Sequence, residues 1–239
     1  MSRPPTATIR TEVMVPLRFP DGFSTTARVF TFEGLADGGE HVALGLGERA
    51  GPLATGADSA APVLARLHSE CLTGDVFGSS RCDCGPQLRE AVTRMAASGG
   101  FLLYLRQEGR GIGLYAKLDA YVLQDDGLDT YEANVALGYG EDQRDYTVAA
   151  QMLFTLGQPT VALLSNNPDK AEQLRRLGVS VSEMVPTGLH LSDDNARYLA
   201  TKVRRGAHRL EVADLIGGEP EGPGGAPRLP ASRAHPKRT

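Results

Sequence analysis

Residues 66–87 read RLHSECLTGDVFGSSRCDCGPQ and hold all three cysteines of the chain, Cys71, Cys82 and Cys84. The preceding run 62–67, PVLARL, is typical of a β-strand, and helical spacing of apolar residues follows the cysteines. Three thiols in one short segment, and none elsewhere, indicate a metal site at this junction. A structural zinc normally has four protein ligands, whereas a catalytic zinc usually has three and leaves one position for water. The stretch therefore favours a catalytic zinc that carries a reactive water.

Spacing alone leaves other interpretations of the cysteines open. Cysteine is often a small buried hydrophobic residue without a ligand. Two of the three could form a disulfide, although Cys82 and Cys84 are too close for an unstrained bridge and an odd count leaves one thiol over. His68 or a more distant histidine could also complete a closed structural zinc site.

The composition is that of a soluble globular protein. The 239 residues suffice for one large domain or two small ones, and 41% are hydrophobic and 23% charged. No apolar run is long enough to cross a membrane, and the N-terminal segment has no stretch typical of a secretory signal. Free thiols fit the reducing cytoplasm, which is the expected location. The net charge of −4 argues against a general nucleic-acid binder, so an anionic ligand would need local positive charges.

The order of predicted elements indicates one α/β domain over residues 11–209, with a mixed sheet layered with helices and a strand-rich N-terminal quarter. Residues 1–10 are expected to be flexible, residues 48–61 to form a loop, and the Gly/Pro-rich tail 210–239 to be disordered. Alternating or apolar runs predict strands over residues 13–17, 25–32, 41–46, 62–67, 101–105, 160–164 and 179–185. Helical spacing and caps predict helices from Cys84 to Gly99, through Tyr121 to Leu123, from Asp129 to Gly138, from near Asp142 to Leu156, from Asn167 to Gly178 and from Ser192 to Arg205.

Two predicted helices carry a cation in the first turn, where the helix dipole favours acidic residues. These cations are Arg144, after Asp142, and Lys170, after Asn167 and Pro168. A bound phosphate would compensate for the unfavourable charge, because exposed N–H groups, dipole and cation would all point toward it. The alternative is that both cations are solvated surface residues. The glycine-rich run 108–113 does not have the spacing of the dinucleotide-binding fingerprint.

Six separated motifs, RLHSECLTGD, SSRCDCGPQL, RQEGRGIGL, DTYEAN, DQRDY and LLSNNPDK, closely resemble bacterial GTP cyclohydrolase II in order and spacing. The resemblance covers about residues 12–209. The length leaves no room for the additional upstream synthase domain of the bifunctional form, so the monofunctional form is expected.

The resemblance implies the first step of riboflavin biosynthesis. GTP cyclohydrolase II opens the imidazole ring of GTP and releases C8 as formate. It also releases pyrophosphate, which gives 2,5-diamino-6-(5-phosphoribosylamino)pyrimidin-4(3H)-one. The resemblance further implies one catalytic Zn²⁺ per subunit, Mg²⁺ on the triphosphate and a homodimer.

The same resemblance assigns roles to individual residues. Cys71, Cys82 and Cys84 match the zinc ligands, Tyr121 the ring-opening tyrosine, Asp142 the proton acceptor and Arg144 the nucleophile. Because guanidinium stays protonated, with a pKa above about 12, stabilising charge on the α-phosphate is the alternative role for Arg144. The residues that match the GTP contacts are Arg66, Leu67, His68, Ser69, Glu70, Gln87, Glu108, Gly109, Arg110, Thr130, Ser165 and Lys170.

Three features depart from the family pattern. They are Ser165, where threonine is frequent, the loop 188–195, which lacks the usual asparagine-rich sequence, and the tail from residue 210. Two other functions remain as alternatives. One is a paralogue that stops at the ring-opened formyl intermediate, and the other is a nucleotide-binding zinc module without turnover.

Overall fold

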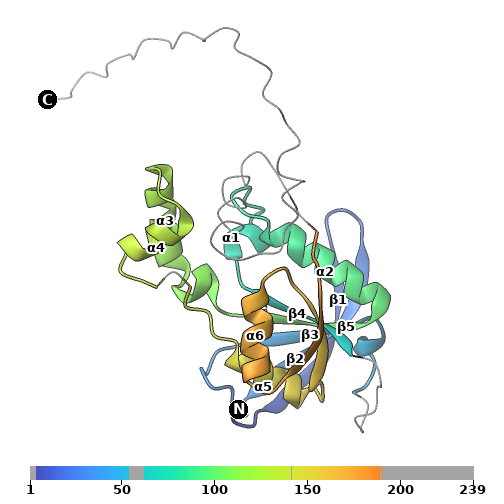
Figure 1. Cartoon of the computed structure of the whole chain (residues 1–239). Coiled ribbons are helices and arrows are strands. Elements are labelled where there is room, and N and C mark those ends of the chain that lie inside the picture. Colours follow the sequence, from blue (N-terminus) through green and yellow to red (C-terminus); the bar gives the residue numbers. More distant parts are fainter. Residues whose placement is uncertain (1–3, 54–61, 141, 189, 191–239) are drawn as a thin grey trace, which may run out of the picture.

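The computed structural model describes residues 4–53, 62–140, 142–188 and 190. Within them a seven-stranded sheet has the strand order β1-β2-β3-β5-β4-β6-β7 and is flanked by helices (Figure 1). The pairs β1–β2, β2–β3 and β3–β5 are antiparallel. The pairs β5–β4, β4–β6 and β6–β7 are parallel. The predicted α/β class with a mixed sheet is therefore confirmed.

The strands are β1 (Thr8–Arg18), β2 (Ser24–Glu33), β3 (Val42–Leu46), β4 (Val63–Ser69), β5 (Gly100–Leu105), β6 (Thr160–Leu164) and β7 (Ser180–Val185). The α-helices are α1 (Leu72–Asp75), α2 (Cys84–Ser98), α3 (Leu114–Asp125), α4 (Thr130–Ala136), α5 (Thr147–Thr155) and α6 (Pro168–Arg176). Two 3₁₀ turns, η1 (Gly47–Ala50) and η2 (Glu108–Gly111), complete the described elements. Strand β1 begins inside the segment 1–10 that was expected to be flexible. The predicted helix 192–205 and the tail 210–239 lie outside the described residues.

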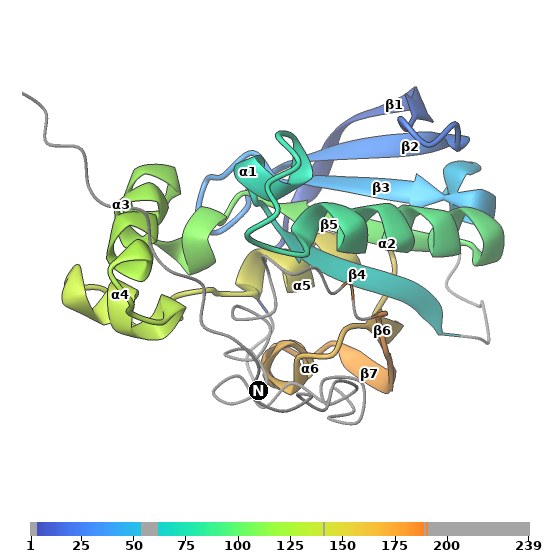
Figure 2. The ribbon, with the colours of Figure 1, turned by 90° about the horizontal axis from the view of Figure 1, so that it is seen from above.

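Alternation along β5 explains why both faces of the sheet are covered. Phe101 and Leu103 belong to the core that the sheet forms with α5 and α6, whereas Leu102 points into the core under α2. Helix α2 contributes Val92 and Met95 to that second core, and Figure 2 shows it lying along one face of the sheet. Burying one large apolar side chain contributes roughly 1.5–3 kcal/mol, so an apolar run such as β5 is stable only between two layers.

Two helix starts agree with their predicted caps. Asp129 and Glu132 form the predicted capping box of α4, and the side chain of Asn167 caps α6 with Pro168 at its first position. The start predicted near Asp142 is wrong, because α5 begins at Thr147.

The residues before α5 form side-chain turns that compete with a helix. The carboxylate of Asp142 accepts the backbone N–H of Arg144 at 3.1 Å, and that of Asp145 accepts the N–H of Thr147 at 2.7 Å. Arg144 therefore precedes the helix, and the dipole reasoning applied to it does not hold.

The parallel strands β4, β5 and β6 end at one edge of the sheet, at Ser69, Leu105 and Leu164. The cysteine stretch, the glycine-rich run and the loop before α6 therefore meet at this edge. Helices α3 and α4 project beyond it (Figures 1 and 2). Such carboxyl edges are the usual ligand sites of open α/β sheets. None of the helices described here combines the length and apolar character that spanning a bilayer requires.

Candidate active site

A cavity opens at this carboxyl edge, between the parallel strands and the α3–α4 pair. It is lined by every residue that the sequence predicted for the site except Asp142. Residues as far apart in the sequence as Arg66 and Gly188 are thus brought together around one space. The cavity wall also includes polar residues that the sequence had not indicated, namely Arg81, Asp83, Lys117, Gln124, Asn134, Asn166, Asn167 and Thr187.

The three cysteines form one cluster at the floor of this cavity. Their sulfur atoms lie within 4.8 Å of one another, and Cys71 Sγ is 3.6 Å from Cys82 Sγ. All three thiols are free, so the disulfide interpretation is wrong. Gly74, in α1, packs directly against the cluster, since a Cβ at this position would lie 2.6 Å from Cys82 Sγ and 3.1 Å from Cys71 Sγ.

The chemistry and spacing of the cluster fit a thiolate-bound metal ion. Zinc–sulfur bonds of about 2.3 Å in a tetrahedral site place the sulfurs roughly 3.8 Å apart, close to the observed separations. Hydrogen bonds from Cys82 and Cys84 hold the pKa of Cys71 well below its usual range, and the hydrogen bond to Cys71 raises the pKa of Cys82 to about 11. A bound cation would displace the protons of the thiols, because a metal ion binds cysteine as the thiolate.

His68 does not complete a four-ligand site among the described residues, because its ring is engaged elsewhere. Its Nε2 atom lies 3.0 Å from the Asp75 carboxylate, and its ring stacks on Tyr104. Asp75 also accepts the Tyr104 hydroxyl at 2.8 Å and the backbone N–H of Cys71 at 3.0 Å. This buried network fixes the position of Cys71, while burial lowers the pKa of His68.

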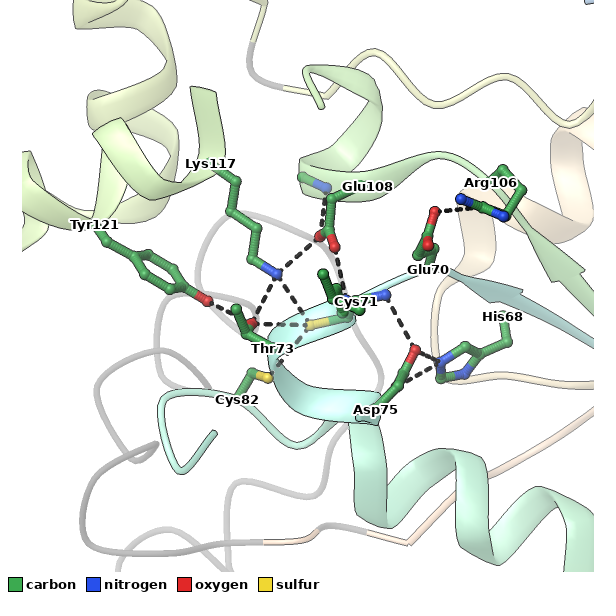
Figure 3. Close-up of polar contacts among 12 residues, drawn as sticks. His68, Glu70, Cys71, Thr73, Asp75, Cys82, Arg106, Glu108, Lys117 and Tyr121 are labelled. Carbon is green, nitrogen blue, oxygen red and sulfur yellow. Dashed lines mark hydrogen bonds and ion pairs between the residues drawn. The ribbon is translucent and has the colours of Figure 1, made fainter. Parts of the chain in front are cut away.

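Lys117 and Glu108 connect the cluster to the neighbouring elements (Figure 3). Lys117 Nζ donates to Cys71 Sγ at 3.1 Å and to Thr73 Oγ1 at 3.0 Å. It also pairs with Glu108 Oε1 at 2.8 Å. The Glu108 carboxylate in turn accepts the backbone N–H of Leu72 at 2.7 Å and that of Gly109 at 2.9 Å.

Tyr121 lies beside this network on α3. Its hydroxyl is 3.4 Å from Thr73 Oγ1, and the Arg81 guanidinium lies 4.4 Å from the centre of its ring. Burial raises the pKa of Tyr121, so the phenol keeps its proton at neutral pH. A protonated hydroxyl next to the cluster is suited to donate a proton to a leaving nitrogen.

The glycine-rich run forms the upper wall of the cavity. Arg110 is the one non-glycine residue with a positive φ, 61°, in the part of the chain that the structure describes. Its guanidinium stacks on Tyr131 at 4.1 Å, and its carbonyl accepts the N–H of Gln143 at 3.0 Å. Arg110 NH1 and Asn134 Nδ2 are both buried without a hydrogen-bond partner among the described residues. Two unpaired donors at the cavity wall indicate a ligand with acceptor atoms.

Cations reach the cavity from β4 and from α6. Arg66 donates to the Leu164 carbonyl at 3.2 Å and to Gln87 at 2.7 Å. Lys170 is buried in the first turn of α6, as predicted, and its Nζ donates to the Leu67 carbonyl at 2.7 Å. Ser165 Oγ accepts the N–H of Asn167 at 3.1 Å.

The predicted pair Asp142 and Arg144 forms an ion pair in which both carboxylate oxygens contact the guanidinium. Burial would raise the pKa of Asp142, but hydrogen bonds and attraction from Arg144 outweigh it and lower this pKa. Arg144 lines the cavity, whereas Asp142 lies behind it. This geometry suits an orienting role for Asp142.

Lys117, Thr73 and Asp75 are the main residues that sequence reasoning missed. Thr73 and Asp75 lie inside the quoted motif RLHSECLTGD, so their position next to Cys71 was a usable signal. Lys117 gave no such signal, because its contacts with Cys71 and Glu108 depend on how α3 packs.

Comparisons with known proteins agree with the resemblance found in the motifs. A family model described as GTP cyclohydrolase II matches residues 11–186. GTP cyclohydrolase-2 of Vibrio cholerae is 53% identical over 188 residues, which are 78% of this chain and 90% of that protein. GTP cyclohydrolase-2 of Vibrio vulnificus is 51% identical over 187 residues, again 78% and 90%. The riboflavin biosynthesis protein RibBA of Bacillus subtilis is 50% identical over 197 residues, 82% of this chain and 48% of that protein. The chain therefore belongs to the GTP cyclohydrolase II family of enzymes.

Proposed function

We propose that this protein hydrolyses GTP in a zinc-dependent reaction and releases formate and pyrophosphate. The product is 2,5-diamino-6-(5-phosphoribosylamino)pyrimidin-4(3H)-one, and the reaction is the first step of riboflavin biosynthesis. One observation carries the proposal, which is that a cluster of three cysteines lies at the floor of a cavity lined by the matched GTP-binding residues.

The cysteines are the proposed zinc ligands. Zinc, when bound, supplies a Lewis acid that lowers the pKa of water to about 7, which suits two successive hydrolyses at C8. Tyr121 donates a proton to the ring nitrogen that departs from C8. Its raised pKa and its place beside Thr73 support this role.

The triphosphate is bound by cations that converge on the cavity from separate elements. The proposed contacts come from the segment 66–70 and from Gln87, Glu108, Gly109, Arg110, Thr130, Ser165 and Lys170, all of which line the cavity. Arg144 stabilises charge on the α-phosphate during release of pyrophosphate, and Asp142 orients its guanidinium. Charge stabilisation is preferred to nucleophilic attack, because a guanidinium paired with a carboxylate keeps its proton.

Mg²⁺ enters with the triphosphate as part of the substrate. The three cysteines form the one cluster of potential metal ligands found in the described part of the chain. A magnesium ion that bridges phosphate oxygens needs few protein ligands, so this finding is compatible with the proposal.

The enzyme is proposed to act as a homodimer. Tyr115, Leu118 and Val122 follow one side of α3 and are 83%, 41% and 62% exposed. A second copy of the chain would cover this apolar stripe. Sedimentation equilibrium of the wild type and of Val122→Ser tests this, with a dimer expected for the former and a weakened dimer for the latter. A monomeric wild type would contradict it.

Incubation of the purified protein with GTP, Mg²⁺ and Zn²⁺ tests the proposed reaction. Formate, pyrophosphate and the pyrimidine should appear in equal amounts. A ring-opened formyl product without free formate would instead support the paralogue that stops early. Unchanged GTP would rule out both enzymatic functions and favour the nucleotide-binding zinc module.

A further inference from the structure

Lys117 is a largely buried cation in contact with the cysteine cluster, and the proposed reaction gives it no role. Its side chain is 11% exposed, and that of its ion-pair partner Glu108 is 8% exposed. An ammonium group has three protons to donate. Here they meet three acceptors, namely Cys71 Sγ, Thr73 Oγ1 and Glu108 Oε1, at 3.1, 3.0 and 2.8 Å.

The stability of the folded protein does not explain why Lys117 and Glu108 form an ion pair here. A buried ion pair is often no more stabilising than apolar residues of similar volume, because both charges lose their hydration. Moreover, the Glu108 carboxylate also accepts the N–H groups of Leu72 and Gly109. The contact that needs another explanation is the one between the ammonium and the sulfur of Cys71.

We propose that Lys117 is a positioning residue of the metal centre, which orients the sulfur of Cys71 and couples it through Thr73 to Tyr121. This inference rests on the proposed zinc site and deepens it. Lys117 and Tyr121 are four residues apart on α3 and therefore lie on the same side of the helix. Figure 3 shows both side chains directed toward α1, with Thr73 between them and Cys71 beside Thr73.

The charge on the cluster gives the contact a chemical purpose. Three thiolates and one divalent cation would have a net charge of −1, and the ammonium lies directly against one of the sulfurs. A hydrogen bond to a ligating sulfur draws electron density from it, so the bound cation becomes more electrophilic. Outer-shell partners of this kind typically change metal affinity or activity by 10–100-fold.

Lys117 also acts on Tyr121, because the side chain of Thr73 contacts both residues. The hydroxyl of Thr73 lies 3.0 Å from Lys117 Nζ and 3.4 Å from the Tyr121 hydroxyl. Because a hydroxyl both donates and accepts, it can accept from the ammonium while it contacts the phenol. Lys117 thereby fixes the position of the proposed proton donor relative to Cys71.

Substitution with Co²⁺ as the metal probe tests the inference without GTP. The sulfur-to-cobalt charge-transfer band of Lys117→Met should shift to lower energy than that of the wild type, because the sulfur loses its hydrogen bond. Competition with a chromophoric chelator should show a 10–100-fold weaker affinity for Zn²⁺, because Cys71 loses the contact that orients its sulfur toward the other two. Asp119→Asn, on the exposed side of α3, is the matched control and should leave both values unchanged.

Lys117→Met leaves the Glu108 carboxylate buried without its ion-pair partner and can therefore fail to fold. The double variant Lys117→Met/Glu108→Gln removes both charges and should show the same shift of the band. An unchanged band and an unchanged zinc affinity in the double variant would overturn the proposal. Since neither measurement needs turnover, this result would leave the proposed GTP hydrolysis standing.

Thr73→Val separates the two effects of Lys117. It should lower kcat for formate release by about 10-fold and leave KM for GTP close to the wild-type value. Because Thr73 Oγ1 also lies 3.7 Å from Cys71 Sγ, the cobalt band should shift, but by less than in Lys117→Met. A wild-type kcat in Thr73→Val would refute the coupling to Tyr121.

Discussion

Replacing Gly74 with alanine would place a methyl group inside the thiol cluster. The added Cβ would lie 2.6 Å from Cys82 Sγ, 3.1 Å from Cys71 Sγ and 3.1 Å from Cys84 Cβ. Heavy atoms in contact prefer separations of about 3.5–4.0 Å, so the sulfur of Cys82 would have to retreat by about 1 Å. Metal–ligand distances vary by only about 0.2 Å in genuine sites. The three sulfurs could then no longer bind one zinc ion together.

The expected loss of zinc affinity exceeds about 100-fold, because the substitution displaces a ligand, whereas outer-shell changes typically cost 10–100-fold. Stability should change much less. Overpacking costs about 1–3 kcal/mol, and alanine recovers up to about 1 kcal/mol over glycine within a helix.

Zinc affinity is measured by chelator competition and the free energy of unfolding by urea titration of the metal-free protein. Gly140→Ala is the matched control, since its Cβ would make an ordinary contact of 3.4 Å with Gln143. Wild-type zinc affinity in a folded Gly74→Ala protein would refute the placement of zinc among these sulfurs.

Three further predictions follow from the described geometry. Arg144→Lys keeps the charge but loses the planar fork, so pyrophosphate release should fall by at least about 10-fold. Near-normal release would show that a simple charge suffices. His68→Gln should make unfolding less sensitive to acid. Because burial lowers the pKa of His68, its contribution to stability is complete above about 6.5 and is lost as the pH falls toward the lower folded pKa. Equal pH dependence of urea unfolding in both proteins would contradict this. Asn134→Leu removes a buried donor without a partner, so it should raise the free energy of unfolding by about 1–3 kcal/mol while raising KM for GTP. A destabilised variant with unchanged KM would show that the amide does not face the ligand.

Local signals predicted much of the fold. The apolar run from Phe101 to Leu105 predicted a strand buried on both faces, and the caps at Asp129 and Asn167 marked where two helices begin. The helix predicted from Asp142 failed for a local reason too. Asp142 and Asp145 bind nearby backbone N–H groups with their side chains and so delay the helix to Thr147.

The candidate site was predictable where chemistry is concentrated in short motifs. Cys71, Cys82 and Cys84 lie within one stretch, so their common role was visible before the structure. Contacts across the fold were not visible in the same way. Lys117 lies 46 residues after Cys71 in the sequence and contacts it from another element. In the sequence, a lysine of an amphipathic helix that makes such a contact looks the same as one that is solvated.

Zinc content and formate release, measured together in the wild type and in Cys82→Ser, test the central claim most directly. Serine keeps the size of the side chain but replaces a thiolate ligand with a poorly acidic hydroxyl. The wild type should bind one zinc per subunit and release one formate for each GTP consumed, and Cys82→Ser should lose both. Full formate release by a zinc-free Cys82→Ser protein would contradict hydrolysis of GTP at the cysteine cluster.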